Sequence, residues 1–234
     1  MTLPHLHLLP GLHGNPELYA PFLEEMGDRP VSTTHYPEDD APTTKSVLGV
    51  ISRTVPQDRE YVLVAESFSG LFATIFAAQR PPNLAGLVLV NTFLQLPFGP
   101  VMYLVTKLRI KMPWFMASGL LLDETADEEF SELTRRLVWE VPSRLIAARF
   151  ALLYRSDARG FATRVTTPTL VLHGERDYFV PREHSLQIER HIPGSERREI
   201  PGPHLLLQSY PQESLEVIQN WWQERGAAAT RPAP

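Results

Sequence analysis

The amino-acid sequence predicts an α/β fold in which helices flank a mostly parallel sheet. Short aliphatic runs alternate with helix-like stretches along most of the chain. The runs at 61–65 and 86–91 are almost wholly apolar, as is typical of strands covered on both faces. With 234 residues and 43% hydrophobic residues, the chain is long enough for one domain with a substantial core. Strands that alternate with helices predict a parallel sheet between two helical layers.

The expected strands are rich in aliphatic and β-branched residues, and the expected helices lie between them. Strands are predicted at 5–9, 31–34, 61–65, 86–91, 169–173 and 197–200. Helices are predicted at 16–26, 45–55, directly after Ser67, 182–190 and 211–225. Further helices are predicted at 102–111, 126–139 and 142–154, with no strand among them. This helical interval predicts a cap over the carboxyl edge of the sheet, where open α/β sheets bind ligands.

These patterns divide the chain into a core, an insertion and a tail. We expect residues 1–93 and 165–225 to form the α/β core and residues 94–164 to form the helical cap. Residues 226–234 are rich in Ala, Thr and Pro, which predicts a disordered tail. The cap is apolar, and its large side chains either line a substrate pocket or pack among themselves and on the sheet. The candidates for the pocket are Leu94, Met102, Trp114 and Trp139.

Composition excludes several classes of function. The formal net charge is -5 and the isoelectric point is about 5.9, so no basic field is present to hold nucleic acid. The chain has no cysteine, which removes disulfides, thiolate metal sites and a cysteine nucleophile. The first residues lack the pattern of a secretory signal, and no apolar run approaches the ~20 residues of a membrane span. We therefore expect a soluble, cytoplasmic protein, and no pattern indicates its oligomeric state.

A strand-to-helix turn at residues 65–70 carries the strongest functional signal. The sequence Ala-Glu-Ser-Phe-Ser-Gly follows the apolar run 61–64 and opens a helix-like stretch. Small residues stand two positions before and after Ser67, at Ala65 and Ser69, so strand and helix can approach closely. A serine at the apex of such a turn is the signature of a nucleophile elbow.

The sequence also allows two alternatives to a nucleophilic Ser67. Were Ser69 the nucleophile, Leu71 would occupy a position that must be small, so the geometry favours Ser67. The serine-rich turn is also consistent with a simple helix N-cap, because Ser and Thr are preferred there.

The loop after the strand 169–173 offers a carboxylate at the same edge of the sheet. In 174–181, Asp177 lies four residues beyond the strand in a turn closed by Pro181, and is the candidate for orienting a catalytic histidine. Glu175 lies nearer the strand with less suitable spacing. The alternative role for Asp177 is that of a turn residue or helix cap.

Residues 201–207 follow the last expected strand and supply a candidate general base. His204 is held between rigid turn residues and an apolar helix start. His173 is expected to pack in the protein interior, and His184 and His191 are expected to face solvent on a polar helix.

The glycine-rich segment 8–15 after the first strand predicts an oxyanion hole. Its backbone N–H groups can turn toward a ligand, and the expected donors are the amides of Leu12 and Phe68. The amide of His13 is the alternative to that of Leu12, and the His13 side chain is a candidate for the pocket together with Phe179. The segment lacks the spacing and the lysine of a P-loop and does not match GxGxxG.

The order Ser67, Asp177, His204 matches the order of the α/β-hydrolases and differs from those of chymotrypsin and subtilisin. From about residue 3 to 225 the chain resembles the α/β-hydrolase superfamily, and within it a branch of small, compactly capped hydrolases. The motifs that carry this resemblance are Leu9-Pro10-Gly11-Leu12-His13-Gly14, Glu66-Ser67-Phe68-Ser69-Gly70, Gly174-Glu175-Arg176-Asp177 and Gly202-Pro203-His204.

The resemblance implies a Ser–His–Asp hydrolase with no metal and no organic cofactor. Three positions depart from the usual pattern: Ala65 and Ser69 replace glycines of the elbow, and Pro10 stands where many relatives have histidine. The first strand begins so early that the two antiparallel strands common at the front of this fold are missing. We therefore expect a sheet of about six strands.

Together these features predict a serine hydrolase that cleaves a carboxylic ester or thioester with a hydrophobic moiety through an acyl-enzyme. Its partner would be a small-molecule acyl substrate. Because fold and triad do not fix the reaction, acyl transfer and C–C bond hydrolysis are alternatives. A non-catalytic small-molecule receptor that keeps the pocket is a rival of a different class.

Overall fold

Six parallel strands form a single sheet in the computed structural model of the protein, which describes residues 2–39, 41–96 and 113–229. The strands are β1 (His5–Leu9), β2 (Val31–Thr33), β3 (Tyr61–Glu66), β4 (Leu84–Val90), β5 (Thr169–Gly174) and β6 (Glu196–Ile200). Their order across the sheet is β2-β1-β3-β4-β5-β6, and every neighbouring pair is parallel. The expectation of about six mostly parallel strands is confirmed.

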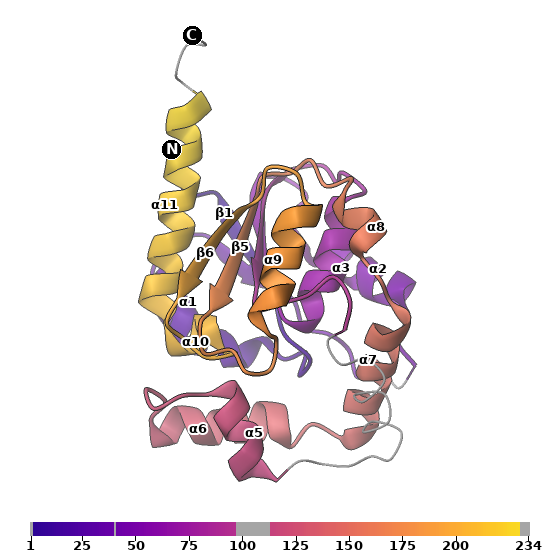
Figure 1. The fold of residues 1–234 in the computed structure, drawn as a ribbon, viewed down its shortest axis with the longest axis vertical. Helices are drawn as coiled ribbons and strands as arrows, with labels where there is room; N and C mark the ends of the chain where they lie inside the picture. The colour runs from indigo at the N-terminus through magenta and orange to yellow at the C-terminus, as the bar shows by residue number, and fades with distance from the viewer. Residues whose placement is uncertain (1, 40, 97–112, 230–234) are drawn as a thin grey trace.

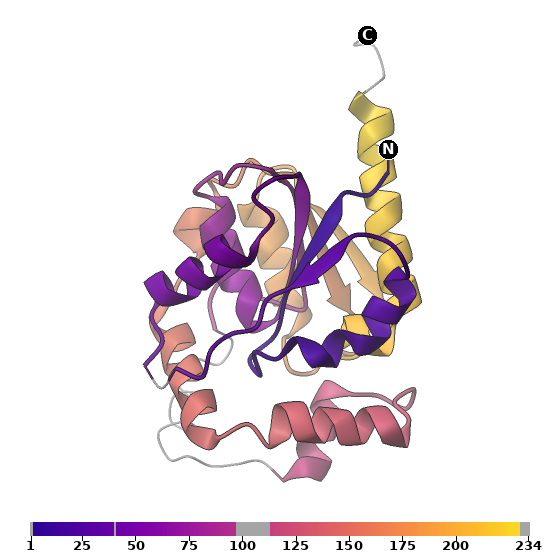
Figure 2. The same ribbon diagram turned by 180° about the vertical axis from the view of Figure 1, so that it is seen from behind.

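Helices cover both faces of this sheet (Figures 1 and 2). One face is covered by η1 (Pro16–Tyr19), α1 (Ala20–Met26), α10 (Leu206–Ser209) and α11 (Pro211–Ala229). The other is covered by α2 (Thr44–Thr54), α3 (Phe68–Ala77), α8 (Arg159–Ala162) and α9 (Arg182–His191). The part of the chain that the structure describes contains no helix long and apolar enough to cross a lipid bilayer.

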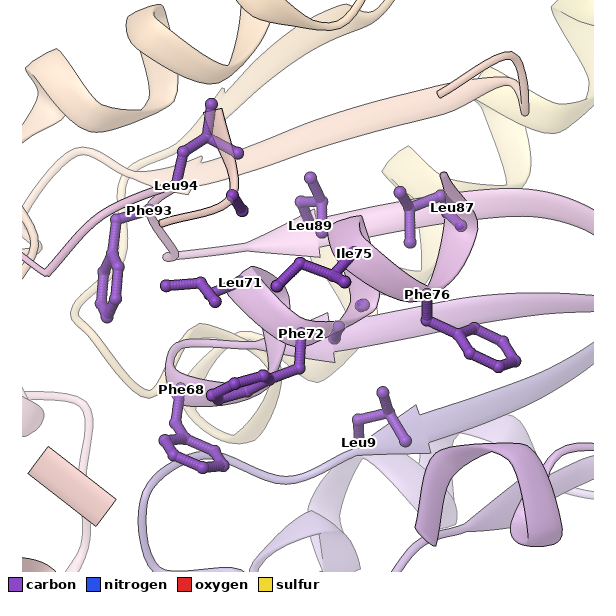
Figure 3. Close-up of a cluster of buried hydrophobic side chains, with 14 of the residues drawn as sticks. Leu9, Phe68, Leu71, Phe72, Ile75, Phe76, Leu87, Leu89, Phe93 and Leu94 are labelled. Carbon is purple, nitrogen blue, oxygen red and sulfur yellow. The ribbon is translucent and has the colours of Figure 1, made fainter. Parts of the chain in front are cut away.

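The central strand β3 is buried on both faces because its alternate side chains enter two separate clusters. Leu63 and Ala65 pack with α2 and α3, whereas Val62 and Val64 pack with α1 and α11. Figure 3 shows the first cluster, in which Phe68, Leu71, Phe72 and Ile75 of α3 lie near Leu9, Leu87 and Leu89 of the sheet. This packing fixes the start of α3, and therefore Ser67, against the carboxyl ends of β1, β3 and β4.

The insertion between β4 and β5 is helical. Its described helices are α5 (Trp114–Leu121), α6 (Glu128–Thr134), the π-helix η2 (Arg135–Trp139) and α7 (Ser143–Arg155). Figure 1 shows α5 and α6 lying across the carboxyl ends of the strands. Leu122 and Leu137 pack there against Leu18 and Leu205 of the core. Phe150 and Leu153 of α7 instead pack in the main hydrophobic cluster together with α3. The C-terminal part of the insertion is therefore attached to the sheet by hydrophobic packing.

Two predicted helices have different boundaries or geometry. The stretch 16–26 is a 3₁₀ turn followed by an α-helix, because Pro21 lacks the N–H that a continuous helix would need to bond Glu17. The stretch 126–139 begins as a helix only at Glu128, where the Asp127 side chain accepts a hydrogen bond from the N–H of Phe130 at 2.7 Å. It then continues as a π-helix rather than an α-helix.

Two further differences concern helices α5 and α11. Helix α5 was not predicted from the sequence. Helix α11 continues to Ala229, beyond the end expected at about residue 225, and the three successive alanines 227–229 have the highest helix propensity. The helix expected at 102–111 lies outside the described residues.

Candidate active site

Ser67 lies at the apex of a strained turn between β3 and α3. Its backbone φ is 50° and ψ is -115°, a conformation that costs a non-glycine residue energy and that surrounding packing must enforce. The hydroxyl of Thr92 donates to the Ser67 carbonyl oxygen at 2.5 Å. A side chain at Gly70 would place its Cβ 2.3 Å from the Thr92 Oγ1, so the residue three positions after Ser67 must be glycine.

Ser69 ties this turn to the loop after β1. Its hydroxyl donates to the carbonyl oxygen of Pro10 at 2.5 Å, and the Tyr36 hydroxyl donates to Ser69 Oγ at 2.9 Å. Ser69 and Pro10, two of the three positions that depart from the usual α/β-hydrolase motifs, are therefore hydrogen-bonded to each other. This bond joins the loop bearing Leu12 to the turn bearing Ser67.

The structure brings Ser67, His204 and Asp177 into one hydrogen-bonded chain. His204 Nε2 is 3.0 Å from Ser67 Oγ, and His204 Nδ1 is 2.8 Å from Asp177 Oδ2. The second oxygen of Asp177 accepts from the backbone N–H groups of Phe179 at 2.9 Å and Val180 at 2.8 Å. The three side chains are only 6%, 4% and 5% exposed, respectively. Such a chain positions a histidine to take a proton from a serine.

Opposing effects act on the protonation of His204. Burial by itself lowers the pKa of His204, but the carboxylate of Asp177 raises it through charge and hydrogen bonding, and Glu66 raises it further through charge. The net result is a pKa above the usual 6.5. The hydrogen-bonded carboxylate thus favours the imidazolium form of His204.

Asn91, at the end of β4, organises the two loops that carry Asp177 and His204. Its Nδ2 donates to the carbonyl oxygens of Pro203 at 2.9 Å and His204 at 2.8 Å. Its Oδ1 accepts from the N–H of Gly174 at 2.7 Å. From the sequence, Asn91 was predicted only to be the last residue of a strand. The one sequence feature that indicated a further role is that Asn91 is a polar residue at the end of an otherwise apolar run.

A side chain of the insertion holds the loop after β1 in place. Arg149 of α7 is buried, and its guanidinium donates to the carbonyl oxygens of Leu12 at 2.6 Å and Pro37 at 3.2 Å. Gly14 has φ 77°, and a Cβ there would lie 2.6 Å from Arg149. Within the described chain, neither the N–H of Leu12 nor that of Phe68 has a hydrogen-bond partner. Both amides are therefore available to an incoming oxygen.

The candidate pocket residues occupy different surroundings. Phe179 lies against the imidazole of His204, with ring centroids 4.9 Å apart. His13 is 7% exposed, burial lowers its pKa to about 4, and its Nε2 has no hydrogen-bond partner among the described atoms.

The remaining pocket candidates belong to the segment between β4 and β5. The rings of Trp114 and Trp139 are 6.3 Å apart. Leu94 is fully buried with the main core cluster. Met102 lies outside the described residues.

Three other candidate histidines take no part in the hydrogen-bonded chain of Ser67, His204 and Asp177. His173 is buried within β5, in agreement with its expected packing role. The expectation that His184 faces solvent was wrong, because its ring lies edge-on to Phe93 at 6.3 Å and partial burial lowers its pKa. His191 is partly buried, and its Nδ1 lies 2.8 Å from the carbonyl oxygen of Gln187.

The fold and this site define a member of the α/β-hydrolase superfamily. A family model described as "Serine aminopeptidase, S33" matches residues 43–202, more than half of the chain, and the protein belongs to this family of hydrolases. The match includes Ser67 and Asp177 and ends two residues before His204. No curated protein matches the sequence significantly.

Solved structures with the same fold cover almost the whole chain. A hydrolase from Pseudomonas aeruginosa PA01 has a TM-score of 0.80 at 18% identity, covering 94% of this chain and 90% of that one. An enol-lactonase from Burkholderia xenovorans LB400 has a TM-score of 0.80 at 14% identity, covering 95% and 92%. A thermophilic esterase from Thermogutta terrifontis has a TM-score of 0.75 at 23% identity, covering 96% and 90%.

Proposed function

We propose that the protein is a serine hydrolase that cleaves a carboxylic ester or thioester with a hydrophobic moiety through an acyl-enzyme. The observation that carries this proposal is the hydrogen-bonded chain from Ser67 through His204 to Asp177. Membership of a serine-dependent hydrolase family supports the reaction class. No step requires a metal or an organic cofactor.

Each side chain then has a defined role. Ser67 Oγ attacks the carbonyl carbon of the substrate while His204 Nε2 takes the hydroxyl proton, and the imidazolium returns that proton to the departing alcohol or thiol. Asp177 accepts from His204 Nδ1 and stabilises the imidazolium. The N–H groups of Leu12 and Phe68 donate to the negative oxygen of the tetrahedral intermediate. Water activated by His204 then hydrolyses the acyl-Ser67 ester.

We infer that the hydrophobic part of the substrate contacts aromatic side chains near the carboxyl edge of the sheet. Phe179 lies against His204, and the neighbouring Trp114 and Trp139 belong to the proposed cap, residues 94–164. Aromatic walls with a few polar groups are typical of small-molecule sites. The proposed core is formed by residues 1–93 and 165–225.

Labelling with a fluorophosphonate probe tests this proposal. Peptide mass spectrometry should find the label on Ser67, and Ser67→Ala should abolish labelling and turnover of p-nitrophenyl esters while the protein remains folded. The matched control is Ser52→Ala, because Ser52 is an exposed serine on α2 and its loss should change nothing. A series of acyl chain lengths would then define the pocket.

Three results would contradict the proposal. Turnover by Ser67→Ala above a trace would exclude Ser67 as the nucleophile. A folded wild-type protein that takes no label would favour the receptor alternative. Acyl transfer or C–C hydrolysis would be favoured by labelling of Ser67 without hydrolysis of any ester in the series.

A further inference from the structure

A second carboxyl group lies buried directly behind the candidate nucleophile. Glu66 is the last residue of β3, and none of its surface is exposed to solvent. Gln208 of α10 donates from Nε2 to Glu66 Oε2 at 3.0 Å. Among the described atoms, Glu66 Oε1 and Gln208 Oε1 have no hydrogen-bond partner. Two buried acceptor atoms thus lack a donor at one place in the core.

The protonated form of Glu66 accounts for this imbalance better than the carboxylate. An ionised carboxyl group only accepts hydrogen bonds, and one neutral amide donor does not compensate for taking a full charge out of water. A proton on Glu66 removes the charge and adds a donor. Burial raises the pKa of Glu66 to about 7, against lowering by hydrogen bonding to Gln208, by the charge of His204 and by the hydroxyl of Tyr19.

The titratable groups that face Glu66 come from three separate segments. Tyr19 of η1 lies beside it, and the Tyr19 hydroxyl donates to the carbonyl oxygen of Leu9 at 2.8 Å. Asp177 and His204 act on it from the loops after β5 and β6. The charge of Asp177 opposes ionisation of Glu66, whereas the imidazolium of His204 favours it. Glu66 and His204 are therefore coupled, and each responds to the proton on the other.

We propose that Glu66 is a positioning residue whose own proton controls how strongly His204 holds its proton. This role rests on the proposed function, in which neutral His204 is the base. When Glu66 is protonated, His204 releases its proton at lower pH and is ready to accept that of Ser67. When Glu66 ionises, its charge stabilises the imidazolium, so neutral His204, the active form, appears only at higher pH.

The substitution Glu66→Gln tests this coupling with little change in size. The new amide keeps an acceptor for Gln208 Nε2, supplies a donor for Gln208 Oε1, and never ionises. The acidic limb of kcat/KM should move to lower pH by roughly 0.5 to 1 unit, the effect expected of one removed charge at moderate distance, with KM little changed. The control Glu60→Gln removes an exposed charge at the start of the same strand and should leave the profile in place.

Nuclear magnetic resonance gives a readout that does not require turnover. The pKa of His204, followed by its ring nitrogen signals, should be lower in Glu66→Gln than in the wild type. In the wild-type protein the ¹³C signal of the Glu66 carboxyl group should titrate near pH 7 rather than near the ordinary 4.5. This second measurement needs no variant, so it stands even if Glu66→Gln fails to fold.

The outcomes separate this inference from the proposed function. A Glu66 carboxyl group that titrates near 4.5, or a His204 pKa unchanged by Glu66→Gln, overturns the role of Glu66 whatever the enzyme does. Coupled titrations together with an unlabelled Ser67 would instead support the Glu66–His204 pair and contradict the proposed function.

Discussion

The guanidinium of Arg149 donates a 2.6 Å hydrogen bond to the carbonyl oxygen of Leu12, 137 positions earlier in the sequence. Arg149 belongs to α7, at the end of the insertion, and Leu12 belongs to the loop after β1. Because a peptide group is planar, fixing the Leu12 carbonyl also fixes the N–H of His13 in the same peptide, and it limits the Leu12 N–H only through the backbone dihedrals of Leu12. The insertion therefore takes part in shaping the proposed oxyanion hole.

Replacing Arg149 by methionine should lower kcat about 10- to 100-fold with a smaller change in KM. The loop would lose its fixed orientation, and one misaligned donor costs about 3 kcal/mol of transition-state stabilisation at most. Arg149→Lys should restore part of the rate because it keeps one donor to Leu12. Steady-state kinetics on an ester measure both effects. Arg144→Met, on the same helix but exposed, is the control, and an equal loss there would exclude a specific role for Arg149.

The rate should rise with pH, with a midpoint above 6.5. The pKa of His204 is raised by Asp177 against the opposing effect of burial, and only neutral imidazole accepts the Ser67 proton. Asp177→Asn removes the charge that raises this pKa, so the midpoint should fall while kcat drops by about 10⁴-fold. The pH profile of kcat/KM measures both midpoints. A rate independent of pH between 5 and 8 would show that His204 is not the base.

Asn91→Ala should destabilise the protein strongly, by about 3 kcal/mol or more. Three buried backbone groups, in Pro203, His204 and Gly174, would lose their hydrogen-bond partner, and each unsatisfied group costs about 1–3 kcal/mol. Chemical denaturation measures the change. Asn83→Ala is a suitable control because the Asn83 side chain makes a single exposed hydrogen bond, to the Gln57 carbonyl oxygen. Equal stability losses in the two variants would contradict the organising role of Asn91.

Asp123→Asn should loosen the insertion without unfolding the core. Arg176, next to Asp177, donates to Asp123 Oδ2 at 2.6 Å and to the Tyr210 hydroxyl at 2.6 Å, and the N–H of Leu205 bonds the carbonyl of Leu121 at 3.1 Å. Because Arg176 is partly exposed, the ion pair contributes only about 1 kcal/mol or less to global stability.

In Asp123→Asn, proteolysis at residues 113–127 should be faster than in the wild type, while the midpoint of global unfolding stays the same. Asp58→Asn breaks an exposed ion pair with Arg59 far from the insertion and serves as the control. Identical cleavage rates in the wild type and Asp123→Asn would show that this cluster does not hold the insertion in place.

Helices of the insertion show where sequence patterns stop being sufficient. In the core, by contrast, the change from a 3₁₀ turn to helix α1 near Pro21 could have been expected from proline chemistry alone. The π-helical turn at Arg135–Trp139 could not, because a change from α to π hydrogen bonding depends on what the turn packs against. Likewise, the sequence predicted that α7 is an apolar helix. It did not predict that Phe150 attaches this helix to the core or that Arg149 bonds Leu12.

Local sequence patterns were enough to predict the strands, their parallel arrangement and the strand ends at which Ser67, Asp177 and His204 lie. Apolar runs, helix periodicity and turn residues specify elements within a few residues of each position. The surroundings of those three side chains depend instead on contacts between distant segments. The burial of Glu66, the three bonds of Asn91 and the reach of Arg149 join segments far apart in the chain, and such contacts exist only once the sheet and helices have packed.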